Sequence, residues 1–259
     1  MNAEWLPAVV LAGGKLDSAT AAKAGTDLAA AVALGGRSLL ARTVSSLRES
    51  GRVHKIVVVG PKGAIENEAR QVGADDVLEE AGNAARNIDV GLTLLRSQSN
   101  TDRVLLVAAD LPFLTAQAVR AFLDSVKPDP ADILLPVGNR ADLENLCPRK
   151  PGTYAKLSGG EVVPASLLLV RPSVLERNQA LFRKMIESRN NPTGAASALG
   201  FLFVVKYFLG MLTAQEVERK ISTLTGSSCK SLMGADARLC ADIGGMADYD
   251  NLVKSFSGM

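Results

Sequence analysis

A carboxylate, Asp110, directly follows an unbroken apolar run at residues 104–109. The run is too short to span a membrane, and it has the length of a strand buried on both faces of a sheet. Open α/β sheets bind their ligands at the carboxyl ends of their strands. Asp110 is therefore placed to hold a divalent cation or to orient a substrate, although a residue that only caps a turn would look the same. The residues alone leave both interpretations open.

Two glycines, Gly13 and Gly14, follow another apolar run at residues 7–12. Paired glycines let the backbone approach a ligand closely and leave N–H groups free to bind an anion. A tight turn is the alternative interpretation. The pair differs from the G-x-G-x-x-G pattern, and no acidic residue is suitably placed for a ribose, so a dinucleotide-binding fold is disfavoured.

Two further side chains have the chemistry to contact a nucleotide, and each has a simpler interpretation. Arg37 precedes an expected helix at residues 39–48, where it would face a phosphate or only be solvated. Asn87 follows an expected strand at residues 75–78, where it or a neighbour would cap the next helix, hydrogen-bond a base edge, or do both.

The elements that must position these residues alternate along the first half of the chain. Strands are expected at residues 7–12, 55–59, 75–78, 104–109 and 131–137, with helices between them. Pro136 indicates that the fifth of these strands lies at an edge or ends there. This alternation is typical of α/β proteins with a mostly parallel sheet.

The second half of the chain is less regular. Residues 138–151 are expected to be an irregular loop, residues 154–170 a hairpin with a glycine turn, and residues 201–212 a buried helix. Thr213 and Glu216 form a capping-box pattern. Residues 238–243 are expected to be extended, before a closing helix at residues 248–256.

Composition excludes several classes of protein. The 259 residues are 47% hydrophobic and 4% aromatic, with a net charge of +2, so neither a general field for nucleic acid nor an aromatic stacking platform is present. Cys147, Cys229 and Cys240 are isolated from one another and are expected to be reduced thiols of a cytoplasmic protein. No secretory signal or membrane span is expected. The low net charge and apolar composition permit a homodimer.

Four stretches, taken in order, resemble the MobA-like NTP transferases, which are related to molybdenum-cofactor guanylyltransferase. They are V-V-L-A-G-G, G-G-R-S-L-L, A-A-D-L-P-F-L-T and the late A-D-I-G-G-M-A-D-Y-D-N-L. The resemblance covers nearly the whole chain. It implies a single domain over residues 1–259, of the three-layer, Rossmann-like nucleotide-diphospho-sugar-transferase type. A substrate-side hairpin and a helical insertion would lie around residues 138–225.

The resemblance also implies an activity: Mg²⁺-dependent transfer of NMP from an NTP to a phosphate or hydroxyl acceptor, with release of pyrophosphate. Positioning and neutralisation of phosphate charge supply most of the catalysis in such a reaction. Asp110 and Asp242 would hold the metal, and Arg37 or Lys23 would supply positive charge to the phosphates. The remaining nucleotide-binding residues would be Leu11, Ala12, Gly13, Gly14, Gly82 and Asn87.

Two positions depart from the family's pattern. The lysine expected shortly before G-G-R is replaced by Ala29 or a neighbour, so Lys15, Lys23 or Arg37 would have to supply its charge. The second aspartate of the family's late D-I-D motif is Gly244 here. Loss of such groups weakens catalysis. The alternative interpretation is therefore a catalytically impaired paralogue that acts as a nucleotide-binding or partner subunit.

Overall fold

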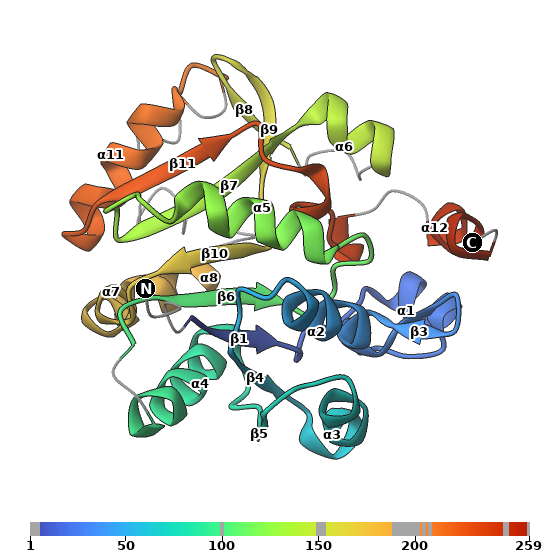
Figure 1. The fold of residues 1–259 in the computed structure, drawn as a ribbon. Coiled ribbons are helices and arrows are strands. Elements are labelled where there is room, and N and C mark those ends of the chain that lie inside the picture. Colours follow the sequence, from blue (N-terminus) through green and yellow to red (C-terminus); the bar gives the residue numbers. More distant parts are fainter. Residues whose placement is uncertain are drawn as a thin grey trace.

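One large sheet organises the chain in the computed structural model, which describes residues 6–98, 101–148, 154–187, 203, 206, 209–245 and 249–257 (Figure 1). The sheet has nine strands in the order β5-β4-β1-β6-β10-β7-β9-β8, and β11 pairs with β7. Its strands are β1 Pro7–Leu11, β4 Lys55–Gly60, β5 Asp76–Glu79, β6 Val104–Ala108, β7 Ile133–Asn139, β8 Ala155–Leu157, β9 Gly160–Pro164, β10 Leu167–Val170 and β11 Cys229–Met233. A separate pair joins β2 Ala33–Leu34 to β3 Arg37–Ser38.

Strand direction divides the sheet into two halves. From β5 through β4 and β1 to β6 every pairing is parallel. β10 then runs antiparallel to both β6 and β7, and the hairpin of β8 and β9 continues beyond them. The expected mostly parallel central sheet is therefore confirmed at its core, although the sheet as a whole is mixed.

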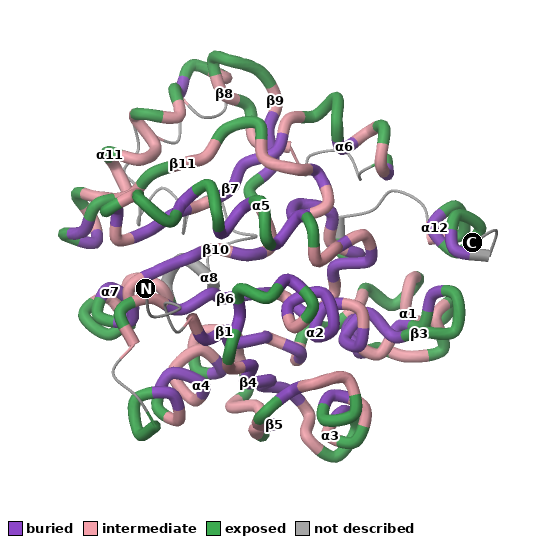
Figure 2. The backbone as a smooth tube through the Cα atoms, in the orientation of Figure 1, coloured by how far each residue is buried: buried purple, intermediate pink, exposed green. Residues whose placement is uncertain are grey.

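Helices cover both faces of the sheet, which gives the three-layer arrangement expected from the sequence. The described helices are α1 Ser18–Ala24, η1 Ala29–Ala31, α2 Leu39–Glu49, α3 Lys62–Gln71, α4 Ala84–Gln98, α5 Ala116–Val126, α6 Arg140–Leu146, α7 Pro172–Arg177, α8 Gln179–Glu187, α11 Ala214–Thr225, η2 Ala237–Leu239, η3 Ile243–Gly245 and α12 Tyr249–Ser257. Figure 2 shows the central strands almost entirely buried between these layers.

Side-chain alternation along the strands separates two cores. In β1, Ala8 and Val10 pack with α2, α3 and α5, whereas Val9 faces the opposite core with α4 and α7. Successive residues of a strand point to opposite faces, so a strand covered on both sides must be apolar throughout. Gly91 of α4 lets that helix approach the sheet, because a Cβ there would be 2.6 Å from Val9 Cγ1.

Pro136 does not mark an edge, as its sequence suggested, because β7 lies inside the sheet. β7 pairs with β10 at Ile133 and Leu134, and with β9 from Val137 onward. Pro136 lies where one partner ends and the next begins, and its carbonyl accepts the N–H of Ala165 at 2.8 Å. A missing N–H is tolerated at such a change of partner.

Two other expectations were wrong. Residues 138–151 were expected to be irregular, but β7 extends to Asn139, whose side chain caps α6 by accepting the N–H of Asp142 at 2.9 Å. Residues 238–243 were expected to be extended, but η2 and the start of η3 occupy them instead. Half of the residues of the buried helix expected at 201–212 lie outside the described residues. At its described end, residues 209–212 are not helical, and Leu209 and Met211 are exposed.

A third apolar cluster supports the loops at the carboxyl edge of the parallel strands. It joins η1 and β2 to α12 through residues that include Val32, Leu34 and Phe256. The Phe256 ring lies 5.4 Å from that of Phe113, in the loop after Asp110, and the guanidinium of Arg42 lies 4.5 Å from its centre. Within the described part of the chain, no helix has the length and apolar character needed to cross a membrane.

Candidate active site

The glycine loop lies between the carboxyl ends of β4 and β6. Ala12 donates its N–H to Val59 of β4 at 2.8 Å, and Ala109 donates its N–H to Leu11 at 3.0 Å. These bonds continue the sheet to its edge, so Gly13 and Gly14 leave it at that point. The parallel register thus places the loop beside the position where Asp110 follows β6.

The ends of two side chains border position 13 and would have to shift to admit a Cβ there. A Cβ there would collide with Glu80 Oε2 and would lie 3.3 Å from Asn87 Nδ2. Glu80 follows β5 directly, and its N–H donates to the Gly60 carbonyl at 3.0 Å. Glu80 was not among the residues predicted from the sequence, although its place at the end of a parallel strand was a usable signal.

Asn87 is buried, with 3% of its surface exposed, and its side chain braces the loop after β5. Its Oδ1 accepts the N–H of Ala81 at 2.7 Å. Asn83 caps α4, since its Oδ1 accepts the N–H of Arg86 at 3.0 Å. Gly82 is exposed with φ of 91°, a conformation that favours glycine. Asn87 and Gly82 therefore shape one loop beside Gly13.

Asp110 and Asp242 are brought to the same edge of the sheet. The N–H of Ile243 donates to the Asp110 carbonyl at 3.1 Å, which places the adjacent Asp242 beside the end of β6. Both side chains are half-buried. Among the described residues no group of three or more His, Cys, Asp or Glu side chains forms a metal site. Mg²⁺ is usually held by one or two protein carboxylates together with phosphate oxygens and water, so the residue types of this pair suit that ion.

Ser166 connects this carboxylate pair to the sheet. Its hydroxyl donates to Asp242 Oδ2 at 3.1 Å, and its carbonyl accepts the N–H of Ala108 in β6 at 2.8 Å. Ser166 lies in the break between β9 and β10, where the sequence analysis expected one continuous strand. Pro164 was the available signal for that break, because proline is a poor residue for a strand interior.

The predicted cations have different surroundings. The guanidinium of Arg37 donates to the Ala41 carbonyl at 3.3 Å and to the Ser45 hydroxyl, so it lies along α2. Lys23, in the last turn of α1, pairs with Asp250 of α12. Their catalytic roles remain predictions.

Lys15 directly follows the glycine loop. Its ammonium lies 3.0 Å from Asp27 Oδ2, and both side chains are largely exposed. Hydrogen bonding to Lys15 holds the pKa of the Asp27 carboxyl below its usual value. Lys15 is therefore a cation beside the loop. Its ion pair with Asp27 is exposed to solvent, so Lys15 can exchange this partner for another anion.

Ala29 lies against the glycine loop. Its N–H donates to the Gly14 carbonyl at 2.9 Å, and only 3% of its surface is exposed. Gly244 lies at the other side of the site, with room for a side chain whose Cβ would be 3.5 Å from Asp242 Oδ1. Both positions depart from the family's pattern, but their surroundings differ. Ala29 is closely packed, whereas Gly244 has room for a side chain.

A sequence model of the MobA-like NTP transferase domain matches residues 8–191, which include the glycine loop, Asp110 and Ser166. The chain belongs to this family. No curated protein matches it significantly. A solved structure described as a hypothetical transferase from Thermus thermophilus is 27% identical over 96% of this chain and 99% of that one, with a TM-score of 0.78.

Two more distant structures share the fold of this MobA-like NTP transferase. CMP:2-keto-3-deoxy-manno-octonic acid synthetase, solved with CTP, is 11% identical over 98% of both chains, with a TM-score of 0.58. The 4-diphosphocytidyl-2C-methyl-D-erythritol synthase of Anaerococcus prevotii is 10% identical over 99% of this chain and 96% of that one, with a TM-score of 0.57. At these identities the likeness shows the fold alone.

Proposed function

We propose that this MobA-like NTP transferase transfers NMP from an NTP to a small acceptor that carries a phosphate or a hydroxyl group, with release of pyrophosphate. The observation that carries the proposal is the meeting of the glycine loop with two carboxylates at one sheet edge. Ala109 is bonded to the strand before the loop, and the next residue, Asp110, is bonded through its carbonyl to Ile243.

Each part of this edge has a role in such a transfer. The backbone of Gly13 and Gly14 would bind the triphosphate, since glycines allow close approach and free N–H groups bind anions. The loop braced by Asn87 would contact the base and ribose. Lys15 would add positive charge after exchanging Asp27 for a phosphate oxygen.

Asp110 and Asp242 would hold Mg²⁺, with Ser166 orienting the Asp242 carboxylate. When bound, the ion neutralises phosphate charge as the bond to pyrophosphate breaks. The protein contributes the alignment of acceptor and phosphate, which is the main source of rate in this class of reaction. Because the hairpin of β8 and β9 borders the half of the sheet that contains Ser166, we place the acceptor on that side.

Pyrophosphate release from a panel of NTPs, tested with sugar phosphates, alcohols and cofactor precursors in the presence of Mg²⁺, tests the proposal. We expect one NTP and one acceptor class to support turnover. Asp110→Asn should lower the rate by roughly a hundredfold or more, whereas Glu68→Gln on α3 should leave it unchanged. Failure of every NTP to bind at millimolar concentration in calorimetry would refute the proposal.

A further inference from the structure

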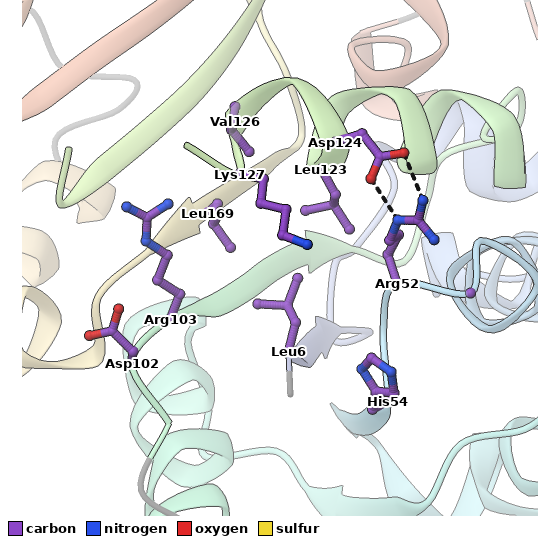
Figure 3. A pocket seen from close by; sticks show the side chains of 11 residues that line it. Leu6, Arg52, His54, Asp102, Arg103, Leu123, Asp124, Val126, Lys127 and Leu169 are labelled. Carbon is purple, nitrogen blue, oxygen red and sulfur yellow. Dashed lines mark hydrogen bonds and ion pairs between the residues drawn. The ribbon is translucent and has the colours of Figure 1, made fainter. Parts of the chain in front are cut away.

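A cavity of about 340 Å³ (Figure 3) lies at the amino ends of the parallel strands, whereas Asp110 follows the carboxyl end of β6. Its lining includes Leu6, His54 and Arg103, which directly precede β1, β4 and β6. At about 3.3 Å per residue, the length of β6 puts this cavity roughly 20 Å from Asp110. It is therefore separate from the candidate active site.

One wall of the cavity is apolar. Leu123 and Val126 come from α5 and Leu169 from β10, and each is at most 6% exposed. Leu6 completes this wall from the other side. Pockets for small ligands usually combine such a surface with a few polar groups that fix the orientation of the ligand.

The charged groups around the cavity do not cancel. Arg52 makes two hydrogen bonds to the Asp124 carboxylate, at 2.6 and 2.9 Å, and it holds the pKa of Asp124 below its usual value. Asp102 pairs with Arg171, outside the cavity. Both carboxylates of the lining are thus already matched by arginines.

Two cations remain. Arg103 Nη2 donates to the backbone carbonyls of Asp129 and Ala131, which are neutral acceptors and leave its charge in place. The Asp129 carboxylate itself pairs with Lys230. Lys127 has no carboxylate within ion-pair distance among the described residues, and Figure 3 shows its side chain extending into the space between Leu6 and Leu123.

We propose that this cavity is a second ligand site, which binds a small organic anion with an apolar body and a single carboxylate or phosphate group. The ammonium of Lys127 binds the anionic group, with Arg103 adding to the positive field. The leucines and Val126 contact the apolar body. His54, at the rim, offers an imidazole edge that borders the bound ligand.

The chain's single histidine makes this site directly observable. The imidazole Cε1–H signal in the NMR spectrum can come only from His54, so it needs no assignment among histidines. We expect phenyl phosphate or benzoate to shift this signal with a Kd near or below about 1 mM, a range open to small ligands. The tighter of the two probes identifies the anionic group. Benzyl alcohol, the neutral analogue, should bind at least about tenfold more weakly, because it cannot form the charge-assisted bond.

Variants locate the binding. Lys127→Met keeps the apolar stem and should weaken binding by about tenfold or more, and Lys127→Glu should abolish it. Lys220→Glu on α11 makes the same charge change elsewhere and should have no effect. Asp110→Asn should also leave binding unchanged, which separates this site from the nucleotide site. The proposal is overturned if neither anion shifts the His54 signal, if benzyl alcohol binds equally well, or if Lys127→Glu binds like the wild type.

Discussion

The N–H of Ile243 donates to the carbonyl of Asp110 at 3.1 Å, although the two residues are far apart in the sequence. This bond is made by backbone atoms, so it fixes where Asp242 lies without depending on its side chain. The direction of the Asp242 carboxylate is set separately, by the hydroxyl of Ser166. Position and orientation can therefore be tested independently.

Removing the Ser166 hydroxyl should disturb the metal site without removing a ligand. We expect Ser166→Ala to raise the Mg²⁺ concentration needed for half-maximal activity by about 10-fold or more, because residues that orient metal ligands typically contribute that much. Ser166→Thr keeps a hydroxyl and should behave more like the wild type. An unchanged Mg²⁺ dependence in Ser166→Ala would show that Asp242 needs no such orientation.

Adding a carboxylate at position 244 should strengthen the metal site. A Cβ at Gly244 has open space and would lie 3.5 Å from Asp242 Oδ1. Gly244→Asp should lower the Mg²⁺ requirement by roughly an order of magnitude, because the number of charged oxygen ligands tunes cation affinity. Gly244→Asn, of nearly the same shape, is the control. Equal effects of the two substitutions would argue against direct ligation.

Lys15 should contribute more to NTP use than Lys23. We expect Lys15→Met to lower kcat/KM for the NTP by roughly a hundredfold, the usual effect of removing one charge-stabilising group. Lys23→Met should have a smaller effect, since Lys23 pairs with Asp250 of α12. Steady-state kinetics of both variants measure the two losses in kcat/KM and show which is larger. The opposite ranking would support Lys23 as the phosphate cation predicted from the sequence.

A lysine at position 29 should destabilise the protein. Ala29 is nearly fully buried against the glycine loop, and overpacking such a site costs about 1–3 kcal/mol. In urea denaturation, Ala29→Lys should lower the free energy of unfolding by more than Ala29→Met, since only lysine must also keep an ammonium near water. If Ala29→Lys is as stable as the wild type, the ammonium has an open path toward the loop.

Glu216 should make stability depend on pH in the acid range. Lys206, and then the Thr213 N–H, lower the pKa of this carboxyl to about 2 from a usual value of 4.5. A lowered pKa in the folded state means that Glu216 stabilises the fold above about pH 4.5, and that this contribution is lost as the pH falls toward 2.

Comparison of Glu216→Gln with the wild type measures this contribution. The difference between their urea midpoints should be larger at pH 7 than near pH 2, because the wild type alone loses the ionised carboxylate. Glu68→Gln on α3 is the control. A difference that stays constant with pH would assign the role of Glu216 to its uncharged contacts.

The parallel half of the fold could be predicted because its signals are local. Buried strands appear as apolar runs, and Thr115, a residue type favoured at helix N-termini, caps α5. The second half was harder, since strand pairing there depends on distant partners. Pro136 looked like an edge signal but lies where β10 gives way to β9, and that arrangement is not written in the surrounding residues.

The candidate site divides in the same way. Gly13, Gly14 and Asp110 could be selected because each ends a strand. Glu80 also follows a strand and could have been selected by the same signal, whereas the importance of Ser166 depends on Asp242, which it meets across the sheet. Arg37 has the right residue type, but its partners on α2 are visible only in the folded chain.

The contacts of α12 have a consequence for how the protein folds. Lys23 of α1 pairs with Asp250 of α12, and these two residues are separated by 227 positions in the chain. Contacts at such separation carry a high entropic cost and generally form late. We therefore expect the loop after Asp110, which packs on α12 through Phe113, to gain its support late in folding. A folding intermediate with a formed sheet and an undocked α12 would have native secondary structure but an unfinished catalytic edge.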